Sequence, residues 1–197
     1  MNDLPDLSAL TLWPEWCPAF RGVRLRDGRA SPLDKGVENR PMAPWSTIAP
    51  NLLGPGRWLA MHAGKHVGGR AGNDGALINV IDTAKVAGWN AYVPRLDDII
   101  PPGQTDAVRL WRKEEGKPFE GIDLHPDDIV TSAIVAVMRV TSVSRPGTDG
   151  PWRFPAQWGW HVEVVPLPDP VPCKGAQGLW RVPDDVAARV RAQWVAP

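Results

Sequence analysis

In the stretch Asp34-Lys35-Gly36-Val37-Glu38-Asn39-Arg40, the six residues from Lys35 to Arg40 contain two cations and an anion. Successive side chains of an extended segment point to opposite sides, so Glu38 and Arg40 are expected on one side and Val37 and Asn39 on the other. Charged groups at the end of such a segment, with Gly and Pro beside them, fit the rim of a pocket. A solvated surface cluster is the alternative that composition leaves open.

A second charged group follows a strand predicted at residues 57–63. The sequence there is Arg57-Trp58-Leu59-Ala60-Met61-His62-Ala63-Gly64-Lys65, which delivers His62 and Lys65 to the far end of the strand. The residues that we expect to meet in one solvent-reaching cleft are Lys35, Glu38, Arg40 and His62.

Five segments occur in an order typical of one family: Leu12-Trp13-Pro14-Glu15-Trp16, Lys35-Gly36-Val37-Glu38-Asn39-Arg40, Trp45, Leu59-Ala60-Met61-His62-Ala63-Gly64-Lys65 and Val171-Pro172-Cys173-Lys174-Gly175-Ala176-Gln177-Gly178-Leu179-Trp180. Together they resemble the ASCH family, a branch of the PUA-like superfamily of small β-barrels. The resemblance covers about half of the chain, at its two ends. It implies an α+β fold, a PUA-like mixed β-barrel with flanking helices, in a single domain over residues 1–197.

The middle of the chain lies outside this resemblance. Proline and glycine interrupt residues 90–128 repeatedly, and only 104–115 leaves room for a short helix. We interpret 90–128 as an irregular insertion draped over the barrel.

Periodicity and turn residues predict the remaining elements. Strands are expected at 7–12, 130–143, 158–167 and 177–182, and 166–172 is expected to be a loop or sheet edge because it holds four prolines. A short helix is predicted at 14–20 and a longer one at 73–89. A terminal helix is predicted to begin after Pro183, which an acidic first turn follows.

Charge and composition limit the classes of function. The formal net charge of +0 removes any global argument for nucleic acid or an anionic membrane, but residues 20–70 are basic and 97–128 are acidic. Eleven tryptophans can fill a barrel core, and a few of them can stack on a planar ligand. The start of the sequence does not read as a signal peptide, no apolar run is long enough to cross a membrane, and the two cysteines form no disulfide framework. These features predict a cytoplasmic protein.

Metal and cofactor sites are not predicted. His62 and His66 would share a face only on a helix, and His62 belongs to a strand. No dinucleotide-binding glycine motif and no Gly-x-Ser-x-Gly elbow occur. Cys17, beside Trp16 and Pro18, is interpreted as a buried thiol.

The first functional prediction is a binding module for RNA or DNA that takes a single base, ordinary or modified. This is the usual proposal for the type of ASCH domain that the Lys-x-x-Glu-x-Arg pattern resembles. Cationic side chains are expected to attract phosphate, namely Lys35, Arg40, Arg57 and Lys65. Trp45 and Trp160 are expected to stack a base, with His62 beside them, and Glu38 or Gln177 to read the edge of the base.

A small hydrolase, either an N4-acylcytidine amidohydrolase or a ribonuclease, is the alternative. Some small ASCH proteins deacylate N4-acylated cytidine with a Lys-x-x-Thr arrangement and a Glu. Lys35 matches that lysine, but Glu38 stands in the position of the threonine, so a water activated by Glu38 would have to replace the nucleophile. A third hypothesis is a protein-interaction domain that uses the acidic middle segment.

Overall fold

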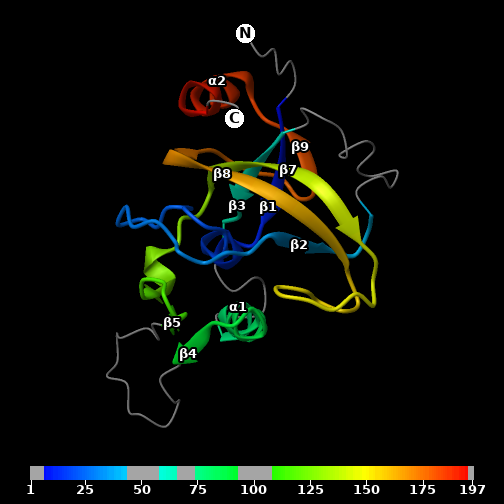
Figure 1. The fold of residues 1–197 in the computed structure, drawn as a ribbon. Coiled ribbons are helices and arrows are strands. Elements are labelled where there is room, and N and C mark those ends of the chain that lie inside the picture. Colours follow the sequence, from blue (N-terminus) through cyan, green and yellow to red (C-terminus); the bar gives the residue numbers. More distant parts are fainter. Residues whose placement is uncertain (1–6, 44–57, 66–73, 93–107, 195–197) are drawn as a thin grey trace.

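A curled six-stranded sheet of half-barrel form dominates the mixed α+β fold (Figure 1). The computed structural model describes residues 7–43, 58–65, 74–92 and 108–194. The strand order is β2-β8-β7-β3-β1-β9, in which β1 and β3 run parallel and the other neighbours antiparallel. The strands are β1 (Ser8–Leu12), β2 (Val37–Arg40), β3 (Leu59–Ala63), β7 (Ala133–Ser144), β8 (Trp158–Pro172) and β9 (Leu179–Arg181).

Each face of this sheet has its own apolar cluster, because alternate residues of a strand point to opposite faces. On β1, Leu10 and Leu12 belong to one cluster and Ala9 to the other. On β3, Met61 belongs to the cluster of Leu10 and Leu12, and Ala60 belongs to the cluster of Ala9. The face of Leu12 and Met61 is the one that carries the charged segment described below.

Helical segments cover both faces. The 3₁₀ helix η1 (Pro14–Ala19) and the following Phe20 pack on the face of Leu12. Helix α2 (Asp184–Gln193) packs on the opposite face, where Val186 and Val190 are buried. In the described part of the chain, no helix has both the length and the apolar character needed to span a membrane.

Most of the predicted elements are confirmed, with two corrections. Strands at 7–12, 130–143 and 177–182, the short helix at 14–20 and the helices beginning near 73 and 183 all have counterparts. Of the two alternatives expected at 166–172, the loop is wrong and the sheet edge is confirmed, because β8 continues to Pro172 and beyond His161 pairs with β7 alone among the described strands. The ladder with β7 is interrupted between Pro166 and Val171, and Pro168 and Pro170 lie in this interruption.

The second correction concerns residues 90–128. Their described part is a regular antiparallel sheet in the order β4 (Asn90–Tyr92), β5 (Val108–Arg112) and β6 (Glu120–Leu124). A strand occupies the centre of the predicted helix at 104–115, because Val108 and Leu110 alternate with exposed Arg109 and are buried. Helix α1 (Asp74–Val86) packs beside this sheet, where Ile81 belongs to the same apolar cluster as Val108 and Leu110.

Asp34 connects this small sheet to the charged segment. Its Oδ1 accepts hydrogen bonds from the indole N–H of Trp89 at 3.0 Å and of Trp152 at 3.4 Å, and its Oδ2 accepts one from Arg112 at 2.8 Å. Burial alone would raise the pKa of the Asp34 carboxyl, but these donors outweigh burial and the pKa lies below its ordinary value. Residues from three parts of the chain therefore meet at one carboxylate, immediately before Lys35.

We predict that Asp34→Ala lowers the free energy of unfolding by about 1–3 kcal/mol, because three donors lose their shared acceptor. Urea unfolding followed by tryptophan fluorescence measures the change. Asp82→Ala is the matched control, since Asp82 is an exposed residue of α1. Equal stability of the two variants would contradict a structural role for Asp34.

Candidate functional site

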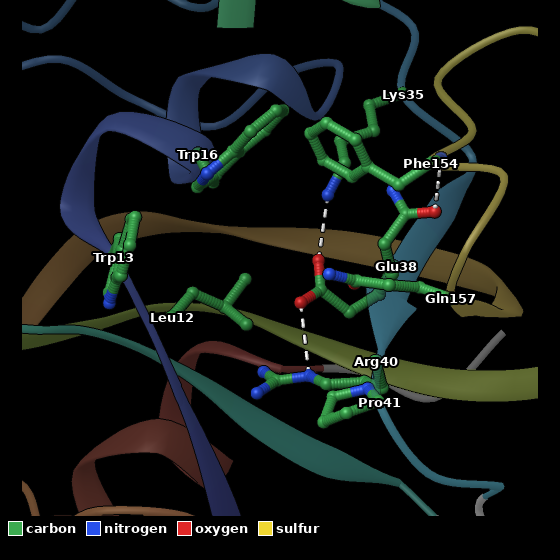
Figure 2. A pocket seen from close by; sticks show the side chains of 10 residues that line it. Leu12, Trp13, Trp16, Lys35, Glu38, Arg40, Pro41, Phe154 and Gln157 are labelled. Carbon is green, nitrogen blue, oxygen red and sulfur yellow. Dashed lines mark hydrogen bonds and ion pairs between the residues drawn. The ribbon is translucent and has the colours of Figure 1, made fainter. Parts of the chain in front are cut away.

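A pocket of about 360 Å³ opens beside β2, and it contains three of the predicted site residues (Figure 2). Its walls come from the end of β1, from η1, from β2 and from the loop between β7 and β8. The lining residues are Leu12, Trp13, Trp16, Lys35, Glu38, Asn39, Arg40, Pro41, Phe154 and Gln157. We call this the first pocket.

A carboxylate between two cations is the polar centre of the first pocket. Lys35 Nζ donates to Glu38 Oε2 at 2.7 Å, and Arg40 Nε forms an ion pair with Glu38 Oε1 at 3.1 Å (Figure 2). The Arg40 guanidinium also donates from Nη2 to the carbonyl oxygen of Thr11 at 3.4 Å. Glu38 and Arg40 therefore lie on one side of β2, as the alternation of the extended segment predicts.

The Lys35 ammonium group is enclosed by aromatic rings. Its Nζ lies 4.8 Å from the ring centroid of Trp16 and 4.6 Å from that of Phe20, within the range of cation–π attraction. The whole residue is 5% exposed. Burial lowers the pKa of the Lys35 ammonium below its ordinary value, although the neighbouring Glu38 carboxylate opposes this shift.

Burial and neighbouring charges also act in opposite directions on the pKa of Glu38, but here the neighbouring charges have the larger effect. Burial would raise the pKa of its carboxyl, but the charges of Lys35 and Arg40 and the hydrogen bond from Lys35 outweigh burial, so the pKa is lowered. Glu38 is thus an ionised, hydrogen-bonded carboxylate at neutral pH. A carboxylate in this state accepts protons poorly, which limits its use as a general base.

Asn39 fixes the opposite wall of the pocket. Its side chain donates to the carbonyl oxygen of Trp152 at 2.8 Å, and its Oδ1 accepts from the backbone N–H of Phe154 at 3.0 Å and from Arg153 Nη1 at 3.2 Å. Arg153 is itself buried and donates to the carbonyl oxygen of Gln157 at 2.9 Å. β2 therefore positions the loop that places Phe154 and Gln157 in the pocket.

The predicted residues His62, Lys65 and Gln177 line a separate pocket of about 340 Å³, which we call the second pocket. The expectation that His62 joins Lys35, Glu38 and Arg40 is therefore wrong. His62 follows Met61 on β3, and adjacent strand residues point to opposite faces of the sheet. Burial lowers the pKa of the His62 imidazole, although its hydrogen bond to the Cys173 carbonyl opposes this shift.

Trp160 does not line either pocket. It is 2% exposed, packs in the apolar cluster of Leu12 and Met61, and donates from Nε1 to the carbonyl oxygen of Met42 at 3.0 Å. Trp45 and Arg57 lie outside the described residues.

Sequence reasoning missed the aromatic and amide groups of the first pocket. Trp13 and Trp16 belong to a segment that carries the family resemblance, which is the signal that could have found them. Trp16 is partly buried and lines the pocket. Phe154 and Gln157 come from a polar loop whose sequence gave no signal.

Two expectations about chemistry concern the thiols and metal ions. Cys17 is 1% exposed, and burial raises the pKa of its thiol, so it is a buried thiol as expected. Among the residues that the structure describes, no group of three or more His, Cys, Asp or Glu side chains is arranged to hold a metal ion.

Comparison of the chain with protein-family models, with curated proteins and with solved structures finds no match. Inferences about function therefore depend on the chemistry of the two pockets.

We predict that Lys35→Met lowers the free energy of unfolding by about 2–4 kcal/mol, because it leaves the buried Glu38 carboxylate with Arg40 alone. Denaturant titration measures the loss, and Lys113→Met at an exposed lysine is the control. The double variant Lys35→Met/Glu38→Leu should recover much of the stability, since it removes both charges. A double variant no more stable than Lys35→Met would contradict this account.

The lowered pKa of Glu38 also predicts a pH dependence. Its ionised form stabilises the fold above the unfolded-state pKa, which is near 4.5, and this contribution is lost as pH falls through the lower folded-state pKa. The stability difference between wild type and Glu38→Gln should therefore shrink as the pH is lowered from 7 through this window. Unfolding titrations of both proteins across it measure the difference, and a constant difference would contradict the prediction.

Proposed function

We propose that the chain is a nucleic-acid-binding module, and that its first pocket takes one base, ordinary or modified, from a single strand of RNA or DNA. The observation that carries this proposal is the combination of a buried Lys35–Glu38–Arg40 network with aromatic side chains around one pocket of about 360 Å³. Polar groups that fix orientation beside flat apolar walls are what a base requires.

The aromatic walls supply stacking. Trp13 is 57% exposed at the pocket, and an exposed indole has no evident role in the core. Trp16 and Phe154 contact each other edge to face, with centroids 5.8 Å apart, and so form a rigid wall. Stacking of a base on such rings contributes about 1–3 kcal/mol and tolerates any base.

The polar groups supply orientation. Lys35 and Glu38 are hydrogen-bonded to each other. Arg40 and Gln157 are therefore the groups best placed to contact a ligand. The amide of Gln157 can both donate and accept, and the Arg40 guanidinium can donate to a carbonyl oxygen of a base or to a phosphate. A site with both kinds of group can distinguish the edges of different bases.

The fold is consistent with this proposal at a coarser level. We infer that the curled half-barrel is a PUA-like domain, because the segments that resemble the ASCH family lie on neighbouring elements. β1 pairs with both β3 and β9, and β2, at the other edge of the sheet, carries the Lys-x-x-Glu-x-Arg segment, whose Arg40 donates to the Thr11 carbonyl oxygen of β1. Within the described residues, the segments therefore belong to one sheet as well as following the family order in the sequence.

A small amidohydrolase acting on an N4-acylated cytidine is the second candidate. The observation that favours it is a buried lysine of lowered pKa beside a carboxylate in a pocket of nucleoside size. The lowered pKa of Glu38 counts against it, since Glu38 would have to activate water in place of the missing threonine. Incubation with N4-acetylcytidine, with chromatographic detection of cytidine, decides between the candidates. Cytidine released by wild type but not by Glu38→Gln would establish the hydrolase and overturn the first proposal.

We predict that Trp13→Ala weakens binding of a fluorescently labelled, mixed-sequence single-stranded RNA by about 1–3 kcal/mol, because one stacking surface is lost. Fluorescence anisotropy at low salt measures the affinity, and the slope of log affinity on log salt should be roughly −2 to −4 for a few phosphate contacts. Phe119→Ala is the matched control, since Phe119 is an aromatic residue 65% exposed outside both pockets. The absence of any binding by wild type to RNA, and to DNA of the same sequence, would overturn the proposal.

A further inference from the structure

The second pocket carries the most informative unassigned chemistry in the described part of the molecule. It lies where the ends of β3 and β8 meet the beginnings of β7 and β9. Ser132 connects these ends, because its N–H donates to the carbonyl oxygen of Gly64 and its own carbonyl oxygen accepts from the N–H of Cys173, each at 3.0 Å. The lining residues are Thr11, His62, Gly64, Lys65, Ser132, Lys174, Gly175, Ala176, Gln177 and Gly178.

We propose that the second pocket holds a phosphate group of the nucleic acid whose base enters the first pocket. The assignment of this phosphate to a nucleic acid rests on the proposed function. The phosphate site itself rests on the charge, the backbone donors and the close-packed glycines of the second pocket.

The charge of the second pocket is positive. Lys65 and Lys174 are its charged side chains, and none of its lining residues is acidic. Both lysines are exposed, and within the described residues neither has a carboxylate partner. A lysine without an internal partner is a mobile point charge that can turn toward a phosphate.

Backbone donors come from the loop after β8. Within the described part of the chain, the N–H groups of Gly175, Ala176 and Gln177 donate to no protein acceptor. Three consecutive N–H groups without a described protein acceptor, beside two lysines, are donors that an anion can use.

Two glycines allow the backbone to come this close. A Cβ on Gly175 would lie 2.2 Å from Cε1 of the His62 ring, so only glycine lets the loop pack on that ring. His62 is 2% exposed and is held between the Cys173 carbonyl oxygen and Thr11 Oγ1, each 3.3 Å from a ring nitrogen. Gly178 has φ +76°, a conformation that other residues rarely adopt. The loop is therefore a built surface that packs on a fixed imidazole.

The two pockets are neighbours at the end of β1. Leu12 lines the first pocket and Thr11 lines the second. Arg40 joins them, since its guanidinium pairs with Glu38 in the first pocket and donates to the carbonyl oxygen of Thr11. Because Leu12 and Thr11 point to opposite faces of the sheet, a strand whose base occupies the first pocket would pass round the end of β1, beside Arg40, to bring its backbone to the second.

The first test uses inorganic phosphate alone, titrated at constant ionic strength against chloride and followed by amide chemical shifts. Saturable shifts are expected at Gly175, Ala176 and Gln177, and they should be lost in Lys65→Gln/Lys174→Gln. The control Lys85→Gln/Lys113→Gln removes two exposed lysines outside both pockets and should keep the shifts. Phosphate that causes no saturable shift in this loop overturns the site.

The second test assigns the source of the phosphate with the single-stranded RNA used for the first pocket. Lys65→Gln/Lys174→Gln should weaken binding several-fold and reduce the salt slope by about 0.7–1.4, which corresponds to one or two phosphate contacts on a single strand. RNA that binds wild type and this variant equally overturns the inference and leaves the proposed function standing. Phosphate shifts without any RNA binding by wild type keep the phosphate site and overturn both its assignment to a nucleic acid and the proposed function.

Discussion

A carboxylate on an edge strand, held between two cations, determines how the first pocket is built. Glu38 is only 7% exposed, and an ionised carboxylate at such burial needs compensating charges and hydrogen bonds. Lys35 and Arg40 supply them from the same short segment. Because the Lys35 ammonium is itself buried, Trp16 and Phe20 must lie against it, which requires η1 to fold over this end of the sheet.

The same segment joins the two sheets. Asp34 at its beginning accepts from Trp89 and Arg112, which belong to the part of the chain around the small sheet. Asn39 near its end holds the loop between β7 and β8. Residues 34–40 therefore connect the small sheet, the pocket and the main sheet. A substitution at either end of this segment is expected to alter the pocket.

As proposed, the two pockets take different parts of one ligand. The first combines aromatic walls with a fixed ionic network, which is the chemistry of base recognition. The second combines mobile lysines with backbone donors, which is the chemistry of phosphate recognition. As proposed, the first would select a base and the second would add affinity that depends on salt. The Lys35–Glu38 pair serves primarily to hold the first pocket in shape, because each group satisfies the other.

Local sequence determined the strands of the main sheet and the sides of the charged segment. Alternation over four to twelve residues is a property of the chain alone, so β1, β7 and the placement of Glu38 and Arg40 on one side of β2 were predictable. The resemblance to the ASCH family identified Lys35, Glu38 and Arg40 as candidate site residues.

Only the tertiary structure decided which residues share a pocket. His62 on β3 is separated by β7 and β8 from β2, which Lys35 precedes, and the two side chains line pockets on opposite faces of the sheet, which depends on the order of the strands. Trp160 is buried in the core because η1 covers it, whereas η1 leaves Trp13 exposed at the surface. The preferences of individual residue types cannot distinguish one tryptophan from another. Phe154 and Gln157 reach the pocket because Asn39 forms hydrogen bonds to the loop that carries them. These bonds join residues more than a hundred positions apart in the sequence, and local patterns carry no information about such contacts.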